Sequence, residues 1–496
     1  MASRAKMQTT PMDSFMMRRP RPEFVLRAAL AYACTQVGSG LLALGPAIAH
    51  SGWVGVPVLV MCGLCSAYTS YLLGWTIFRL QVHPSSESES GDSSSEESTE
   101  EESSSEKIEA TEVEINSYDD VGEQALGMPG RVISLVVQAL MLIGVCTIFL
   151  VLTGINAEQL EEIFGLKWLE KRPLILLAAL LEVTPSVLMA TVKETFCLTA
   201  FGAFCSAVCS LVILASAFTH DTAIDDCLDD GQENSWPFFT DFKGLSLSWN
   251  TIVFSFGGIN VLPTLLSDFR QRGVLGRALV SFTWRSYLFI IFFYVSQDGS
   301  LEKETEELPK LFVKEALVAI CGYKAGGLAM ASQKVDSNVL IGLHGCSPSR
   351  GGGWDLIVPR MLQVAYAAIL MHVLLAFPVP FHALAETIEA ALGIRDQLVE
   401  SSLCGRGLLL RVPRFLALGA FLAYIIPFFG ALLNLVAALA GQASVFILPV
   451  LFSWAVQRQQ GHRIRAYDWL LGAVAESGRA TGEKATTQTI RLRSPR

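Results

Sequence analysis

Long apolar runs separated by polar segments set the pattern of this chain. Most runs hold about 20 residues with few or no charges, the length that an α-helix needs to cross a hydrocarbon core of about 30 Å. A soluble domain would instead alternate apolar and polar positions with a period of 3.6 or 2 residues. We therefore predict an all-α polytopic membrane protein with about ten transmembrane helices. The predicted helices cover residues 24–50, 53–80, 131–155, 173–192, 196–218, 246–266, 278–296, 358–380, 412–436 and 441–457.

The loops between these helices differ in charge, and the difference predicts the orientation of the chain. Both tails and the loops 267–277 and 381–411 are basic, whereas the loops 156–172 and 219–245 are acidic or mixed. Because basic loops stay in the cytoplasm, we expect both termini there. The predicted organisation is a cytoplasmic N-terminal tail (1–23), helices one and two (24–80), a disordered acidic cytoplasmic loop (81–130), helices three to seven (131–296), a long non-cytoplasmic loop (297–357), helices eight to ten (358–457) and a cytoplasmic C-terminal tail (458–496).

Composition agrees with the membrane prediction, but the net charge has a local origin. Hydrophobic residues make up 51% of the chain, charged residues 17%, and the mean hydropathy is +0.44. The net charge of −9 arises in one segment, since residues 85–112 hold eleven acidic side chains and a single lysine. This tract has almost no apolar surface to bury and repels itself, so we expect it to be disordered. Serines followed by acidic residues between Ser85 and Glu106 fit an acid-directed kinase; a solubilising spacer is the alternative.

Two of the predicted helices carry a Gly-rich step six residues before a proline. The step runs from Gly40 to Pro46 in the first helix and from Gly257 to Pro263 in the sixth, and these helices begin two groups of five. Interruptions at matching positions of two halves are typical of inverted-repeat transporters with a site at the midplane. An unwound segment exposes helix N-termini that can bind a carboxylate and carbonyls that can bind an ammonium group. The alternative is that the glycines only allow close helix packing.

Ionisable side chains inside a membrane are costly and are functional candidates by default. Glu182 in the fourth helix and His372 in the eighth are the clearest examples. Burial favours the neutral form of a carboxyl group, which suits a proton carrier, so both residues are candidates for proton coupling. The alternatives are a structural hydrogen bond for Glu182 and a satisfied interior imidazole for His372.

Motifs of enzymes and metal proteins do not occur in the sequence. It contains no P-loop, no Ser/His/Asp set and no Cys/His spacing typical of a zinc site. Cys62 and Cys65 form a lone CxxC inside an apolar helix, where thiols usually behave as small hydrophobes. We therefore expect no catalysis, no cofactor, no bound metal and no nucleic acid partner.

Four blocks of the sequence resemble the amino acid/auxin permease superfamily, especially its neutral amino acid transporter branch. The blocks are VGSGLLALGPAIAHSGW (37–53), FSFGGINVLPTLLSDF (254–269), AFPVPFHALAETIEAAL (376–392) and IIPFFGALLNLVAALAGQASVFILPVL (425–451). The resemblance implies a five-plus-five inverted-repeat fold that holds an amino acid at the breaks of helices one and six. Carried over position by position, it implicates as substrate-binding residues Val37, Gly38, Ser39, Gly40, Leu41, Phe256, Gly257 and Gly258.

The chain departs from the pattern of this family at several places. Sodium-coupled members carry an asparagine where this chain has Cys34-Thr35-Gln36, and they carry a hydroxyl in helix eight, where this chain has no Ser or Thr between Leu362 and Phe377. Because sodium prefers oxygen ligands, sodium coupling is doubtful, and a coupled proton or uncoupled transport is favoured. In addition, Ile259 replaces a histidine, and the expected eleventh helix is missing or degenerate.

The resulting hypothesis is a secondary active or facilitative transporter of amino acids that works by alternating access in a lipid bilayer. A transporter-like amino acid sensor without flux is the alternative. A channel is disfavoured because no helix shows repeated pore-lining polar residues. A plasma membrane and a vacuolar or lysosomal membrane are not separated by the sequence.

Overall fold

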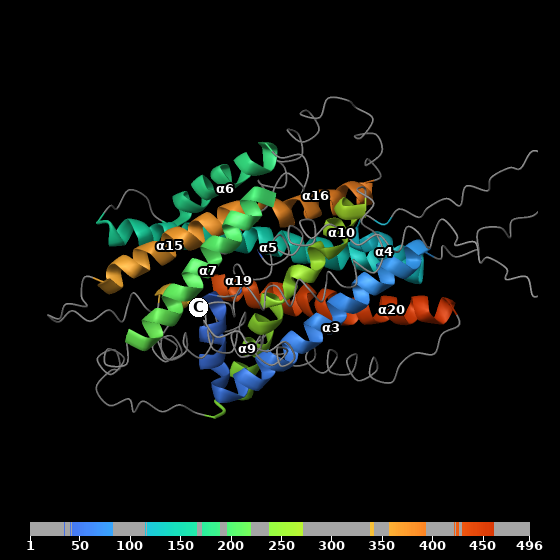
Figure 1. Cartoon of the computed structure of the whole chain (residues 1–496), viewed down its shortest axis with the longest axis horizontal. Helices are drawn as coiled ribbons and strands as arrows, with labels where there is room; N and C mark the ends of the chain where they lie inside the picture. Colours follow the sequence, from blue (N-terminus) through green and yellow to red (C-terminus); the bar gives the residue numbers. More distant parts are fainter. Residues whose placement is uncertain are drawn as a thin grey trace, which may run out of the picture.

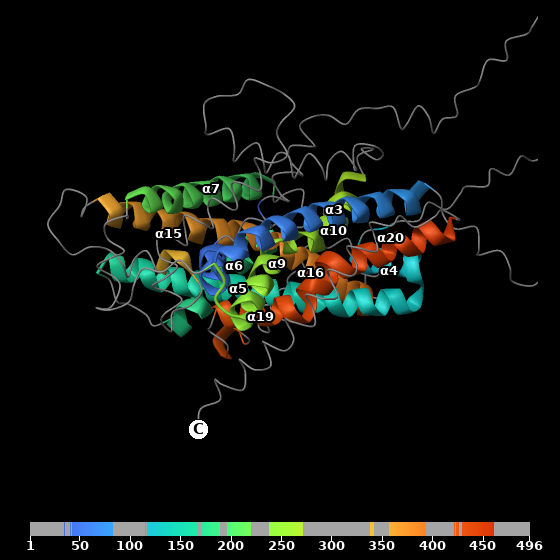
Figure 2. The same ribbon diagram turned by 90° about the horizontal axis from the view of Figure 1, so that it is seen from below.

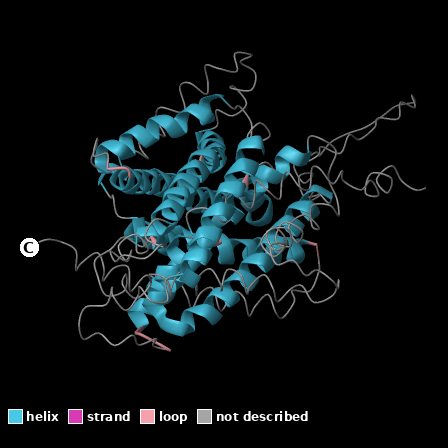
Figure 3. Ribbon diagram, turned by 60° about the vertical axis from the view of Figure 1, so that its left-hand side comes forward, coloured by secondary structure: helices cyan, strands magenta, loops and turns pink. Residues whose placement is uncertain are grey.

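Helices make up nearly all of the described chain in the computed structural model (Figures 1 and 3). The structure describes residues 34, 40, 42–82, 115, 117–165, 171–188, 196–219, 238–270, 338–341, 357–392, 421, 423–425 and 429–460. No strand occurs among these residues. The predicted all-α class is therefore confirmed for this part of the chain.

The helices are long and run mostly along one direction, with α7 beside α15 and α3 beside α20 in both Figure 1 and Figure 2. Residues 42–51 form the first described helix. The others are η1 (Gly52–Val54), α3 (Gly55–Val82), α4 (Tyr118–Leu126), α5 (Met128–Ile163), α6 (Lys171–Leu188), α7 (Phe196–Thr219), α9 (Phe242–Ser255), η2 (Gly257–Val261), α10 (Leu262–Arg270), α15 (Ile357–Ala376), α16 (Pro378–Leu392), α19 (Phe429–Val436), η4 (Ala437–Gly441), η5 (Ala443–Ile447) and α20 (Leu448–Gln459).

Five apolar helical stretches in the described part are long enough to cross a membrane. They are Leu42–Ile77, Met128–Ile163, Phe242–Leu266, Arg360–Ile388 and Phe429–Gln459, and shorter apolar helices cover Pro173–Glu182 and Leu198–Ile213. The first stretch contains a corner at Gly52, whose φ of 72° is a left-handed conformation that favours glycine. It therefore holds parts of two predicted helices, as Figure 1 shows.

Helix α6 shows how these helices divide between lipid and bundle. Four leucines on one face are exposed, while Ile175, Ala179 and Glu182 on the other are buried. The exposed residues are Leu176, Leu177, Leu180 and Leu181. Since apolar side chains can face lipid at no cost and an ionisable one cannot, the exposed face is the lipid-facing one and Glu182 points into the protein.

One end of the bundle is where the first corner meets the start of α9. The Val54 N–H donates to the Phe238 carbonyl at 3.0 Å, and the Thr240 hydroxyl donates to the His50 carbonyl. Gly244 lies so close to the His50 carbonyl that a larger residue would not fit. We call this end the η1 end.

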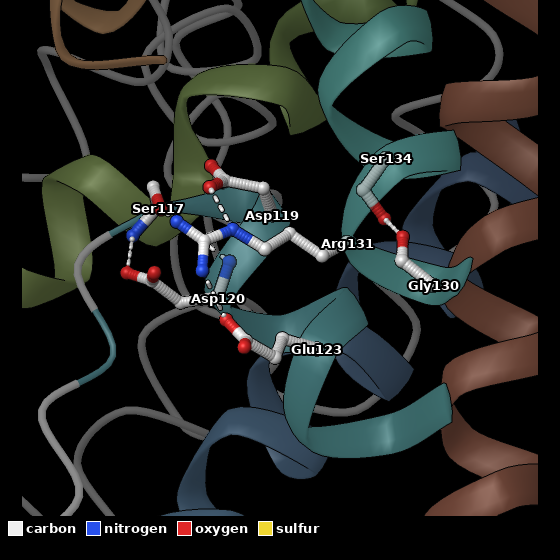
Figure 4. A network of polar contacts seen from close by, with 7 residues as sticks. All are labelled: Ser117, Asp119, Asp120, Glu123, Gly130, Arg131 and Ser134. Atoms are coloured by element: carbon white, nitrogen blue, oxygen red, sulfur yellow. Dashed lines mark hydrogen bonds and ion pairs between the residues drawn. The ribbon is translucent and has the colours of Figure 1, made fainter. Parts of the chain in front are cut away.

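The opposite end is formed by α4 and its tight hairpin with α5 (Figure 4). Ser117 begins α4 in a reciprocal capping box with Asp120, and Gly127, with φ 71°, turns the chain into α5. Arg131 of α5 reaches back to Glu123 at 2.9 Å and to Asp119 at 4.0 Å. We call this end the α4 end.

Helices α3, α4 and α20 are tied together at the α4 end. Arg79 near the end of α3 donates to the side chain of Gln460 at 2.6 Å, and Gln459 donates to the carbonyl of Ala125 at 3.0 Å. The buried Tyr118 hydroxyl donates to the Ser444 carbonyl at 2.8 Å. The prediction of disorder over 81–130 is therefore wrong for its last residues, which form a docked helix. The capping box and buried apolar residues such as Ile115, Tyr118 and Val121 stabilise this helix.

Two predicted helix boundaries are also wrong. The eighth helix does not end at residue 380, because α16 continues it to Leu392 after a turn at Phe377 and Pro378. No loop separates 412–436 from 441–457, since α19, η4, η5 and α20 form one helical stretch. The segment Ala437–Gly441 is small and apolar, so it stays helical by widening into π turns.

Several expectations fall outside the described residues. These include the predicted helix 278–296, the acidic tract 85–106 and most of the loop 297–357. Within that loop, Asn338 donates to Asn156 of α5 at 3.0 Å, and Val339 and Leu340 are buried in the core. Part of the long loop therefore packs on the helix bundle.

Candidate functional site

The predicted sixth helix is broken at Gly257, as expected. At the end of α9, Phe256 adopts φ −100° and ψ 13°, and its N–H donates to Val253, three residues back, at 3.1 Å. The chain continues as the 3-10 turn η2, in which the Asn260 side chain donates to the Gly257 carbonyl at 2.7 Å. Two glycines disfavour a regular helix here, and Pro263 removes one main-chain donor.

Gly40, at the predicted break of the first helix, lies directly against the end of α9 in the sixth predicted helix. An ideal Cβ on Gly40 would lie 2.6 Å from the Cα and 2.6 Å from the Oγ of Ser255, the last residue of α9. The glycine therefore lets the first helix touch the backbone of α9 at its end. The matched glycine steps, 217 residues apart in the chain (Gly40 and Gly257), are brought together in space.

Other residues implicated by the family resemblance have mixed outcomes. Phe256 and Gly258 lie with Gly257 at the break and are buried. Those of the first helix that flank Gly40 lie outside the described residues; they are Val37, Gly38, Ser39 and Leu41.

Met141 of α5 and the π-helical segment lie beside the break. Gly257 alone is partly exposed in the otherwise buried run 251–266. A Cβ on Gly257 would lie 2.6 Å from the terminal methyl of Met141, and one on Gly441 would lie 3.6 to 3.9 Å from Ala437, Val253 and Met141. The break thus faces apolar and uncharged groups of α5 and η4.

Sequence reasoning missed the residues that α5 and the π segment contribute. Met141 and Gly441 carry no signal that separates them from other apolar positions. Gln138 and Gln442, in contrast, are amides inside apolar runs, and polar groups in such runs are a readable sign of an internal position. Gln138 donates to the Asn260 carbonyl at 2.5 Å, and Gln442 donates to Asn250 at 2.9 Å.

Glu182 is buried at the interface of α6 with α5. Thr153 donates to its Oε1 atom at 2.6 Å. Thr153 lies twelve residues beyond Met141 on α5 (153 − 141), which is roughly 18 Å along a helix. The structure therefore does not bring Glu182 to the helix-six break, and it gives this carboxyl group the structural hydrogen bond named as the alternative.

His372 lies between three helices. Its Nδ1 is 2.8 Å from the Gly202 carbonyl of α7 and 4.0 Å from the thiol of Cys34. A carbonyl can only accept, so Nδ1 carries the hydrogen, and Nε2 is left as the acceptor of the neutral ring. Nε2 is buried and has no hydrogen-bond partner among the described residues.

Ligands for a metal ion are not grouped in the described part of the chain. No set of three or more His, Cys, Asp or Glu side chains that could hold a metal occurs there.

Comparisons with known proteins found one relative in sequence and similar solved structures. An Arabidopsis thaliana protein described as amino acid transporter AVT1J is 23% identical over 420 residues, which are 84% of this chain and 78% of that protein. Among solved structures, the nucleobase-cation-symport-1 family transporter Mhp1 in a closed conformation gives a TM-score of 0.46 at 13% identity, covering 95% of this chain and 91% of the other. A Na⁺-coupled sialic acid symporter in an outward-open state gives 0.42 at 14% identity, covering 97% and 92%.

A family profile settles the classification. The profile of transmembrane amino acid transporter proteins matches residues 22–90, 103–297 and 358–469. The matched residues include both glycine steps and the helices that surround them. The chain is thus an integral, multi-pass membrane protein that belongs to the transmembrane amino acid transporter family.

Proposed function

We propose that this protein is a secondary transporter of small neutral amino acids that works by alternating access, with a proton or no ion as the coupled species. The observation that carries the proposal is the close approach of Gly40 to Ser255 beside the break at Gly257. Paired breaks of this kind offer main-chain donors and acceptors to the two charged ends of an amino acid. The expected substrate-binding residues are those of both breaks.

The groups around the break at Gly257 favour a small, uncharged side chain in the substrate. Met141, Val253 and Gly441 are apolar, and no charged side chain lies among the described residues that contact Gly257 or Gly441. A cationic or anionic side chain would be desolvated there without a partner, which is costly. The Met141 side chain is flexible, so it can adjust to substrates that differ by a methyl group.

The surroundings of His372 support a proton rather than sodium as the coupled ion. Nε2 of the neutral ring has no partner among the described residues and can take a proton, while the family resemblance implies that Cys34-Thr35-Gln36 replaces the asparagine of sodium-coupled members. A cycle in which Nε2 gains and loses a proton would link the three helices that meet here to the pH on one side of the membrane. Glu182 is the second candidate, because its burial makes its charge sensitive to rearrangement of α5 and α6.

An uptake panel in proteoliposomes tests the function. Radiolabelled amino acids are offered with and without sodium and with an imposed pH gradient. We expect saturable uptake of small neutral amino acids that is unchanged by sodium. Sodium-dependent uptake would contradict the proposed coupling, and saturable binding without flux would favour the sensor.

Two substitutions separate the candidate proton carriers. His372→Asn keeps a donor near the position of Nδ1 for the Gly202 carbonyl but removes the Nε2 acceptor. Glu182→Gln keeps an acceptor for Thr153 but cannot ionise. If His372 carries the proton, the pH dependence of uptake flattens in His372→Asn and persists in Glu182→Gln. The reverse result would assign the role to Glu182, and two unchanged profiles would remove both.

A further inference from the structure

Two buried side-chain amides hold the broken helix, one before and one after the break at Gly257. On one side, Nε2 of Gln442 donates to Oδ1 of Asn250 at 2.9 Å. On the other, Nε2 of Gln138 donates to the main-chain carbonyl of Asn260 at 2.5 Å. We call the Gln442–Asn250 pair the η1-side clasp and the Gln138–Asn260 pair the α4-side clasp.

The positions of the clasps follow from the course of the helices. Asn250 lies seven residues before Gly257 on α9, the half that starts at the η1 end. Asn260 lies three residues after Gly257, toward α10 and the α4 end. Gln138 is one helical turn closer to the α4 end than Met141, which touches Gly257. The break at Gly257 thus lies between the two clasps.

Each clasp leaves hydrogen-bonding groups unmet. The Nδ2 atom of Asn250 and the Oε1 atom of Gln442 have no partner among the described residues, and neither do Oε1 of Gln138 and Oδ1 of Asn260. The orientations are forced at the α4-side clasp, because each amide nitrogen there faces a carbonyl and a flipped amide would place two oxygens together. The four residues are at most 2% exposed.

A half-satisfied amide is well suited to a gate that must open. While the clasp is closed, its unmet atoms lack the bonds that water would give them, and this offsets part of the gain from the bond that is made. When the clasp opens, water reaches all of these atoms. The closed and open states of the clasp therefore differ little in free energy. A pair with every group satisfied, such as Tyr118 with Ser444, favours its closed state more strongly.

We propose that the two clasps are the gates of this transporter, so that opening the η1-side clasp admits substrate from the η1 end and opening the α4-side clasp releases it at the α4 end. The proposal rests on the proposed alternating-access function. Both clasps hold the same element, α9 with η2, but fix it to different partners, η4–η5 and α5. Their relative strength sets which face is open more often.

Substrate affinity measured from each face tests the proposal. Gln442→Leu and Gln138→Leu keep a side chain of similar size and remove the bond. In membrane vesicles of the two opposite orientations, we expect Gln442→Leu to lower KM at the η1 face and raise it at the α4 face by roughly three- to tenfold, and Gln138→Leu to do the reverse. Asn434→Leu is the matched control, since the Asn434 amide donates only within its own helix, to Gly430 at 2.8 Å.

A second readout does not depend on flux. Hydrogen exchange of main-chain amides should rise in α9 but not in α10 for Gln442→Leu, and in η2 and α10 but not in α9 for Gln138→Leu. KM changes of the same sign at both faces, or equal increases of exchange in both halves, would mean that the amides only stabilise the fold and would overturn the proposal. If the wild-type protein binds amino acids without flux and the exchange pattern is as expected, the proposed transport function is wrong, whereas the role of the clasps in holding the broken helix stands.

Discussion

Replacing Gly40 by alanine is the sharpest test of the close approach between the two breaks. The added Cβ would lie 2.6 Å from the Cα of Ser255, and main-chain atoms of a helix cannot rotate out of the way. To reach an ordinary separation of 3.4 Å, the first helix and α9 must move apart by about 0.8 Å (3.4 − 2.6). The two breaks would then no longer fit the same substrate.

The size of the effect follows from this displacement. Extra volume in a well-packed core typically costs about 1–3 kcal/mol of stability. A misplacement of roughly 1 Å between groups that act together can lower a rate about a hundredfold. We therefore expect Gly40→Ala to lower the maximal uptake rate by roughly 10- to 100-fold, with a moderate loss of thermal stability.

Two further variants show whether the geometry is the cause. Gly122→Ala is the control for overpacking away from both breaks, because its Cβ would lie 2.7 Å from the Gly130 carbonyl oxygen; the melting temperature should fall while uptake per folded protein changes by less than about twofold. Ser255→Gly in the Gly40→Ala background removes the clashes with the serine side chain but leaves the clash with the main chain of residue 255, so it should restore uptake only in part. Uptake per reconstituted protein is measured with melting temperature in detergent. Normal uptake by Gly40→Ala with a normal melting temperature would refute the reasoning.

The remaining predictions concern the α4 end. Burial raises the pKa of the Asp119 carboxyl group above its ordinary 3.8, with Asp120 adding to the shift and Arg131 opposing it. Because the folded state then binds the proton more tightly than the unfolded state, stability is lost as the pH rises from about 3.8 through the raised pKa. Asp119→Asn should raise the melting temperature at neutral pH and flatten its pH dependence. An unchanged pH profile of the melting temperature would exclude this carboxyl group as the cause. Glu123→Gln, which alters a half-exposed ion pair, is the control. Tyr118→Phe leaves the Ser444 carbonyl without its donor and should cost about 1–3 kcal/mol, seen as a lower melting temperature; an unchanged value would mean that water replaces the hydroxyl.

The sequence predicted the helical class and the broken sixth helix because both depend on local chemistry. Apolar runs of membrane length leave few alternatives to a helix, and the Gly257-Gly258 pair before Pro263 disfavours a regular one. The matching positions of the two glycine steps predicted a substrate site shared by both helices, which stays a prediction; the structure adds that Gly40 packs against Ser255.

Other features depend on interactions between distant residues and were missed. A loop was predicted between residues 436 and 441, but this stretch packs against α5 and α9 and continues the helix as π turns. Proline normally ends a helix, but Pro378 stands at the first turn of α16, where the missing N–H is tolerated. The docking of α4 depends on Gly122 and Gly130, which let α4 and α5 approach closely, a relation that no single segment reveals.

The attachment of α3, α4 and α20 to one another at the α4 end also has a topological consequence. Val82 at the end of α3 and Ile115 before α4 are the last and first described residues on the two sides of the acidic tract, and both adjoin elements that are bonded to α20. The described chain on both sides of residues 83–114 therefore lies at the same end of the bundle. Loop-closure entropy changes only slowly with length. An internal deletion within 83–114, or a reporter domain inserted there, should therefore leave the helix bundle folded. This tract is thus the natural position for a fluorescent sensor of the transport cycle.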